Sequence, residues 1–333
     1  MTTLWADGFD SNSATDLLYD YVCGSTPGFV AGRRAGGFAL SINTTSRVCQ
    51  RSLSSSPSTI FASVAIKTAE TAASDLFSFD EGSITHITLL RALDGAIYVA
   101  RGGSGGVALG TSTLLAPSNI WTWFQIKVVI HATLGSVEIR DSGGAVRLNL
   151  TNQNTKNGGT GIVNEVILGG RITSSTYAYD DLHVWDSTGS ICNTFTDESR
   201  VDAIFPSAAG DVTQWTPSVG TNWDCVNENP VVTTDYVSSS TPGNQDLYAF
   251  TDLPHVPVSI YGLTVAAVAT KDEVGARSFK LLTKRSSLNT GATQALSLGS
   301  WLRYTNVVEA DPGTSAAWTP TTVNAAQFGI EAL

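Results

Sequence analysis

The sequence predicts an all-β protein made of two tandem sandwiches. Short runs rich in β-branched and aromatic residues alternate with Gly, Asn, Asp and Ser along the whole chain. Amphipathic helix patterns are almost absent. Charged residues make up only 14% of the 333 residues, against about 25% in a typical domain. The surface is therefore expected to be rich in hydroxyl and amide groups rather than in charges.

The clearest predicted element is a three-strand meander. A long strand pattern covers residues 121–133 (WTWFQIKVVIHAT), and two shorter ones follow at 136–141 (SVEIRD) and 145–150 (AVRLNL). The connectors TLG and SGG supply glycines for tight hairpins. We also expect a hairpin turn at 102–106 (GGSGG), since it lacks the Lys-Ser/Thr ending of a phosphate loop and is too flexible to mount a nucleophile.

A change of composition marks the predicted domain boundary. Residues 205–230 are rich in Pro, Gly and Asn, which is typical of a passage between domains. We place the first domain at 1–208, with 200–206 (RVDAIFP) as a late strand, and the second at 209–333.

Weaker patterns concern local structure. Residues 68–79 show some helical periodicity, and 319–330 have room for one helical turn. The tripeptide WTP occurs at 215–217 and at 318–320. It is either a chance repeat or a sign that the first and last strands of the second sandwich lie side by side.

Charge and hydropathy exclude several classes of partner. The net charge is −10, and the 19 Lys and Arg residues are scattered, so neither nucleic acid nor an anionic membrane is an expected partner. The longest apolar run, 258–270, is too short to span a membrane. The N-terminal sequence lacks the pattern of a secretory signal. We therefore expect synthesis in the cytoplasm and, for action outside the cell, release by another route such as lysis.

The four cysteines have neither the spacing of a zinc site nor a CxxC motif. The local pairing would join Cys23 to Cys49 and Cys192 to Cys225. A chain of this size does not need bridges for its stability. Free or buried thiols are therefore the expectation, with the two disulfides as the alternative.

Three segments carry a resemblance to a known family: 4–10 (LWADGFD), 119–150 (NIWTWFQIKVVIHATLGSVEIRDSGGAVRLNL) and 177–189 (YAYDDLHVWDSTG). With them, the first two hundred residues resemble the concanavalin A-like (laminin-G-like) domains of tailed-phage virion proteins. The resemblance implies a jelly-roll sandwich in which the strand at 177–189 lies beside the first strand. The remainder resembles the domain that follows in many phage structural proteins, a smaller jelly-roll-like β-sandwich.

Aromatic residues are the candidates for carbohydrate binding. In a regular strand at 177–185, Tyr177, Tyr179 and Trp185 project from one face, and Trp121 and Trp123 share a face of their own strand. Sugar rings stack on such side chains. A sandwich core also needs large aromatics, so burial is the alternative for these residues.

Four aspartates are the candidates for a calcium site. Lectin-like sandwiches often hold calcium with loop carboxylates, and the resemblance places Asp7 and Asp10 near Asp180 and Asp181. The alternative is that Asp180 accepts hydrogen bonds from loop amides. No other cofactor is expected.

The chain lacks recognisable catalytic motifs. The Glu-x-Asp-x-Glu pattern of glucanases on this scaffold and the G-x-S-x-G elbow of hydrolases are both missing. The four histidines are far apart in the sequence and are expected to be structural. We therefore expect a protein without enzymatic activity.

The resemblance implies a component of a phage virion in the tail, a fibre or the particle surface, made in the host cytoplasm. It would bind a host-surface polysaccharide and act as a homotrimer among other virion proteins. A capsid decoration protein without a ligand and a polysaccharide depolymerase are the alternatives.

Overall fold

The structure, a computed structural model, describes residues 3–11, 13–42, 48–69, 74–169 and 176–333. It divides into two compact units, Met1–Val201 and Asp202–Leu333. The boundary predicted after residue 208 falls inside β16 (Pro206–Thr213), which pairs with β19 (Gln245–Phe250) of the second unit. Residues 202–208 therefore belong to the second unit. The late strand predicted at 200–206 is wrong, since 200–205 have no regular structure.

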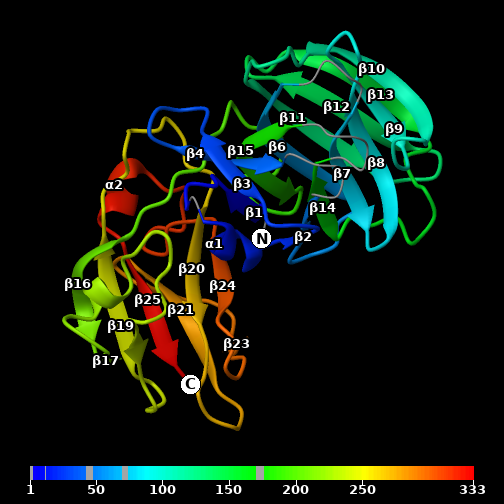
Figure 1. Cartoon of the computed structure of the whole chain (residues 1–333). Helices are drawn as coiled ribbons and strands as arrows, with labels where there is room; N and C mark the ends of the chain where they lie inside the picture. The colour runs from blue at the N-terminus through cyan, green and yellow to red at the C-terminus, as the bar shows by residue number, and fades with distance from the viewer. Residues whose placement is uncertain (1–2, 12, 43–47, 70–73, 170–175) are drawn as a thin grey trace. The chain divides into compact units, whose positions relative to one another are not determined.

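Unit 1 contains two antiparallel sheets (Figure 1). The first, sheet A, has eight strands in the order β13-β12-β11-β6-β15-β4-β3, and β1 also pairs with β15. Its strands are β1 (Thr3–Asp7), β3 (Gly28–Ala31), β4 (Phe38–Ile42), β6 (Thr59–Thr68), β11 (Thr122–Val129), β12 (Gly135–Asp141), β13 (Val146–Gln153) and β15 (Tyr177–Asp186). The predicted meander is confirmed as β11, β12 and β13, and the first strand does lie beside the strand at 177–186.

Sheet B, the second sheet of unit 1, has seven strands in the order β10-β9-β8-β7-β14-β5-β2. Its strands are β2 (Val22–Cys23), β5 (Cys49–Ser52), β7 (Ser74–Glu81), β8 (Ile84–Arg91), β9 (Ala96–Arg101), β10 (Val107–Leu115) and β14 (Glu165–Leu168). The turn predicted at 102–106 is confirmed between β9 and β10. The helical pattern at 68–79 is wrong from residue 74 onward, where β7 begins; residues 70–73 lie outside the described residues.

Alternation of apolar side chains builds the core between sheets A and B. In β11, Phe124, Ile126 and Val128 are buried in this core, and in β8 Ile87 and Leu89 meet them from the other sheet. Side chains of a strand alternate between its faces, so each sheet also has an outer face. A short helix, α1 (Ala14–Leu18), adds Leu17 to the core and is N-capped by Ser13.

One disulfide closes the edge of sheet B. Cys23 of β2 and Cys49 of β5 are register partners and are bonded to each other. The expectation of free thiols is therefore wrong for this pair. Cys192 and Cys225 are buried, unbridged thiols, so the second bridge of the alternative pairing does not form.

Unit 2 is a smaller antiparallel sandwich. Its main sheet has the order β16-β19-β25-β21-β22, with β23 also paired to β21, and two-stranded sheets join β17 to β18 and β20 to β24. Its core includes Val265 and Val308 from β20 and β24 and Phe279 and Phe328 from β21 and β25. The elements not yet defined are β17 (Thr216–Pro217), η1 (Trp223–Cys225), β18 (Val237–Ser238), β20 (Leu263–Ala269), β21 (Ser278–Lys284), β22 (Leu288–Thr290), β23 (Gln294–Ala295), β24 (Leu302–Val308), α2 (Pro320–Asn324) and β25 (Gln327–Ala332).

The two WTP segments do not bring the ends of unit 2 together. The first and last strands, β16 and β25, each pair with β19, which lies between them. The side-by-side interpretation is therefore wrong. The single helical turn predicted within 319–330 is confirmed as α2, where Thr319 caps the helix and Pro320 is its first residue.

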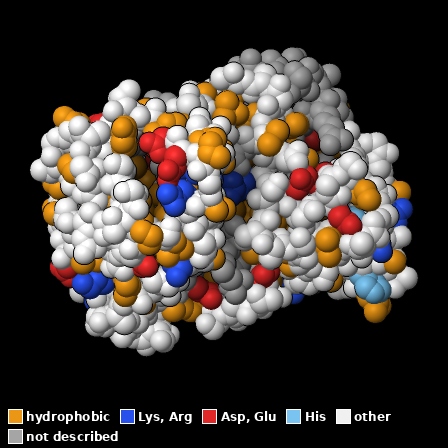
Figure 2. Space-filling model, turned by 90° about the horizontal axis from the view of Figure 1, so that it is seen from below, with side chains coloured by type: hydrophobic (Ala, Val, Ile, Leu, Met, Phe, Trp, Pro, Cys, Tyr) orange, Lys and Arg blue, Asp and Glu red, His pale blue; other side chains and the backbone are white. Residues whose placement is uncertain are grey.

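The surface agrees with the low charge of the sequence. On the face shown in Figure 2, charged side chains are scattered and most of the area is neither charged nor hydrophobic. In the part of the chain that the structure describes, none of the helices has the length and apolar character needed to cross a membrane.

Candidate functional site

A bulge in β15 decides where the predicted site residues point. Asp180 pairs with Ala65 and His183 with Ser63, so three steps along β15 oppose two along β6. The extra residue is Asp181, whose φ is 53°. One inserted residue exchanges the two faces of a strand.

The bulge places the aromatic residues of β15 on opposite faces. Tyr177 and Tyr179 precede it and lie in the core between the sheets, where the Tyr179 hydroxyl donates to the Leu76 carbonyl (2.7 Å). Trp185 follows it, lies on the outer face of sheet A and stacks on Phe61, with ring centroids 5.5 Å apart. All three aromatic residues of β15 are at most 1% exposed. The predicted row of exposed aromatics is therefore wrong, because a sugar could not reach these rings.

A chain segment covers Trp185 and its neighbours. Within residues 194–199, the Thr194 carbonyl accepts from Trp185 Nε1 (2.9 Å), and Phe195 packs edge-on against Phe61. The backbone of Thr196 exchanges two hydrogen bonds with the Gln125 side chain. This covering segment closes the outer face of sheet A over β6, β11 and β15.

The tryptophans of the meander differ in exposure. Trp123 is 4% exposed and offers no surface to a ligand. Trp121 precedes β11 and is half-buried, with Lys67 Nζ 5.1 Å from its ring centroid. Of the five predicted carbohydrate-binding residues, Trp121 alone keeps an accessible ring.

The bulge turns both aspartates toward the turn at 32–37. Asp180 Oδ2 accepts from the backbone N–H of Arg33 (2.6 Å), as the alternative prediction for this residue stated. Asp181 Oδ2 lies 2.6 Å from Arg33 Nη2 and 3.4 Å from Arg34 Nη1, and its Oδ1 accepts from the Val201 N–H. Burial, together with the charge of Asp181, raises the pKa of Asp180 to about 6.

The other two candidate calcium ligands also accept backbone hydrogen bonds. Asp7 Oδ1 accepts from the Phe9 N–H (2.7 Å), and Asp10 Oδ1 from the Phe38 N–H (2.9 Å). Among the described residues, no group of three or more His, Cys, Asp or Glu side chains is arranged to hold a metal ion. In this structure the four carboxylates therefore hold turns and an arginine cluster in place.

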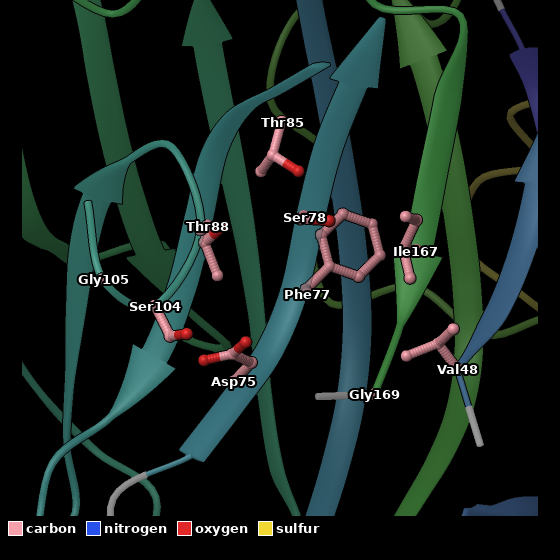
Figure 3. Close-up of a pocket in the computed structure, with 11 residues that line it drawn as sticks. Val48, Asp75, Phe77, Ser78, Thr85, Thr88, Ser104, Gly105, Ile167 and Gly169 are labelled. Carbon is pink, nitrogen blue, oxygen red and sulfur yellow. The ribbon is translucent and has the colours of Figure 1, made fainter. Parts of the chain in front are cut away.

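A pocket opens instead on sheet B (Figure 3). Ser78, Ile167 and Thr88 are register partners on β7, β14 and β8, so their side chains share the outer face of this sheet. The turn at 102–106 contributes Ser104, whose hydroxyl lies near the Asp75 carboxylate at one end of the pocket, with Thr85 at the other end (Figure 3). The cavity volume is about 150 Å³, and the remaining lining residues are Val48, Phe77, Gly103, Gly105 and Gly169.

Hydrogen bonds hold the hydroxyl side chains of this sheet B pocket. Ser78 Oγ donates to Asp80 Oδ1 and Thr85 Oγ1 to Asp80 Oδ2, both at 2.7 Å. Thr88 Oγ1 donates to the Gly102 carbonyl at 2.7 Å, which anchors the 102–106 turn. Gly102 has a φ of 84°, a conformation that glycine adopts without strain.

An aromatic ring lies on the same sheet face. Tyr98 of β9 is the register partner of Leu90, which in turn pairs with Asp75, so the three side chains project to one side. Tyr98 is half-buried, and its pKa is raised by burial and by the negative charge of Asp75. Tyr98 thus lies on the pocket side of sheet B, across Leu90 from Asp75.

Two of the four histidines, His86 and His183, make structural contacts. His86 is buried; its Nδ1 accepts from the Asn157 N–H (3.1 Å), so its Nε2 donates to Glu81 (3.1 Å). Hydrogen bonds from Thr160 and Gly161 hold the pKa of Glu81 down at about 2. His183 contacts Thr3 and stacks on Trp185, and burial lowers its pKa to about 4.

No protein-family model and no curated protein matches the chain. Among solved structures, a sialidase aligns with 55% of this chain at 10% identity and a TM-score of 0.41, but only 18% of the sialidase is covered. A carbohydrate esterase from the Shiga toxin-encoding bacteriophage phi24B aligns with 56% of this chain and 99% of its own (13% identity, TM-score 0.39). Domain 4 of an extracellular GH43 arabinanase from Geobacillus stearothermophilus, in complex with arabinotriose, aligns with 49% of this chain and 76% of its own (17% identity, TM-score 0.36). Such low similarity neither assigns the chain to a family nor transfers a function to it.

The residues of the sheet B pocket were not predicted as binding residues from the sequence. They come from five separate places in the chain: 48, 75–88, 103–105, 167 and 169. The alternation of Phe77, Ser78 and Phe79 was the available signal, because it puts a hydroxyl on the face opposite the core.

Proposed function

We propose that this chain is a non-enzymatic glycan-binding protein that holds one sugar ring in the sheet B pocket. The lining of the cavity supports this proposal: four hydroxyl side chains and one carboxylate surround it, and Tyr98 lies on the same sheet face. Ligand pockets that enclose a drug-sized molecule span ~300–1,000 Å³. A cavity of about 150 Å³ suits a single ring or the end of a longer glycan.

We also propose that the pocket has no enzymatic activity. Glycosidases need two carboxyl groups about 5–9.5 Å apart. Among the described residues that line the pocket, Asp75 is the one carboxylate. The hydroxyl of Ser104 has no histidine among those neighbours to activate it.

A glycan array probed with the labelled full chain tests this function. The blocking variant is Ser104→Trp, which fills the pocket from a residue that makes no hydrogen bond to the described part of the chain. The matched control is Ser142→Trp, at an exposed position in the turn between β12 and β13. We expect wild type and Ser142→Trp to bind the same glycans, and Ser104→Trp to lose at least tenfold in affinity with an unchanged unfolding midpoint. An array on which the wild type binds nothing would reject the proposal.

The biological setting is proposed from the resemblance of the first two hundred residues to phage virion domains. In that setting the chain is a virion component, made in the host cytoplasm and released by lysis, that attaches the particle to a host-surface glycan as a homotrimer. Immunogold electron microscopy of purified particles tests this setting. Gold at the tail supports attachment, gold over the head indicates decoration instead, and unlabelled particles contradict virion membership. Light scattering that gives a monomer contradicts the trimer.

A further inference from the structure

Three hydroxyl groups of the pocket already donate their protons in hydrogen bonds within the protein. Ser78 and Thr85 each donate to one oxygen of the Asp80 carboxylate, and Thr88 donates to the Gly102 carbonyl. Both oxygens of the Asp80 carboxyl group and the Gly102 carbonyl oxygen accept in these contacts, and a hydroxyl has one proton and two lone pairs. These three hydroxyls therefore offer lone pairs, and not protons, to a ligand.

Turning a hydroxyl around would be costly. Asp80 is 0% exposed, and so is unable to replace a lost donor with water from the surface. A buried carboxylate that loses a hydrogen-bond donor is strongly disfavoured. The orientation of the Ser78 and Thr85 hydroxyls is thus set by the protein before any ligand arrives.

The other two polar side chains of the lining are Asp75 and Ser104. The Asp75 carboxylate is an acceptor, and Ser104 can donate or accept. None of the described lining residues is Lys, Arg or His. An anionic group in this cavity would meet the lone pairs of Ser78, Thr85 and Thr88 and the carboxylate of Asp75, without a cationic side chain among the described lining residues to compensate.

We infer that the sheet B pocket selects sugars that donate hydrogen bonds and carry no anionic group, that is, neutral and amino sugars, over carboxylated ones. This selectivity rests on the proposed glycan-binding function and specifies its ligand class. Sugar hydroxyls and an ammonium group supply the donors that Ser78, Thr85 and Thr88 lack, whereas a carboxylate supplies none.

The test uses matched sugars that differ in one group. Glucose, glucosamine and glucuronic acid, and the corresponding galactose set, are immobilised through the same linker beside the glycan array. We expect the neutral and amino sugars of the set that binds to be retained at least tenfold more tightly than the uronic acid. Uronic acids that bind as tightly as the neutral sugars would overturn the inference and leave glycan binding intact. An array and sugar sets on which nothing binds would instead reject the proposed function itself.

Two further measurements keep the inference open to contradiction. Replacing the hydroxyl of the bound sugar by fluorine, which cannot donate, should weaken binding as much as removing it; retained affinity would show that the pocket donates. Ser104→Lys places a cation at the pocket and should shift the ratio of acidic to neutral binding at least tenfold toward the acid, whereas the control Ser142→Lys should leave it unchanged. An unchanged ratio in Ser104→Lys would place the selection elsewhere and overturn the inference.

Discussion

The outer faces of the two sheets of unit 1 differ: a chain segment covers that of sheet A, whereas that of sheet B carries a pocket. On sheet A, residues 194–199 cover Phe61 and Trp185 and bond to Gln125. On sheet B, the hydroxyls of Ser78 and Thr88 line a pocket. The face with more aromatic residues is closed, and the face with small polar residues holds the cavity.

This difference shows that residue type alone does not locate a binding face. Trp185 is the kind of large aromatic residue on which sugars stack, yet here it is fully buried under residues 194–199. An aromatic residue on a sheet face is available to a ligand only if no other segment of the chain covers that face.

Trp185→Ala should destabilise unit 1 by about 3–5 kcal/mol, because it empties a fully buried site and removes a hydrogen bond to Thr194. The measurement is chemical denaturation. Trp121→Ala is the matched control: its ring is half-buried, so we expect a loss of less than about 1 kcal/mol. If Trp185→Ala kept its stability but lost glycan binding, sheet A would be the binding face.

Removing the disulfide should cost about 3 kcal/mol. The bond between Cys23 and Cys49 closes a sequence separation of 26, and such a loop gives about that much stability. The double variant Cys23→Ala, Cys49→Ala should therefore unfold at lower denaturant concentration than wild type. Cys192→Ala, which removes a buried but unbridged thiol, should cost less than half as much; equal costs would mean that the bridge contributes nothing.

Tyr98→Ala should weaken glycan binding about fivefold to tenfold, since an aromatic contact is worth about 1 kcal/mol beyond its buried area. Isothermal titration with the strongest array glycan measures this change. Tyr98→Phe keeps the ring and should bind as wild type does. Unchanged binding by Tyr98→Ala would confine the ligand to the pocket itself.

The smallest effect concerns pH and sheet A. The pKa of Asp180 is about 6 in the fold, above its ordinary value of about 3.9. The folded state thus favours the protonated acid, and this contribution to stability is complete below pH 4 and lost as the pH rises through 6. The free energy of unfolding of wild type minus that of Asp180→Asn should fall by on the order of 1 kcal/mol between pH 4 and pH 7, since solvent screens part of the repulsion. The subtraction cancels other titrating groups, so a difference that is flat with pH would contradict the raised pKa.

The strands of the meander were predictable because their apolar residues alternate and glycines mark the turns. The pairing of β1 with β15 followed from the family resemblance. The bulge at Asp181 was not predictable, because one extra residue in a strand leaves the local pattern unchanged while it exchanges the faces of everything after it. That single residue explains why Tyr179 and Trp185 were assigned to the same face.

The candidate site was harder to predict than the fold. The segment 194–199 covers sheet A through contacts between residues more than a hundred positions apart, such as Phe61 and Phe195. The sheet B pocket likewise depends on strands from distant parts of the chain. Such long-range contacts are set by topology and not by local pattern, so the sequence could indicate a lectin-like sandwich but not its binding face.

The most direct test of glycan binding on sheet B is a crystal structure of the chain soaked with its strongest array glycan. We expect electron density for one sugar ring between Thr88, Ser104 and Ile167, with a sugar hydroxyl within hydrogen-bond distance of Thr88 Oγ1. A ring on Trp121 or in unit 2, with the sheet B pocket empty, would contradict it.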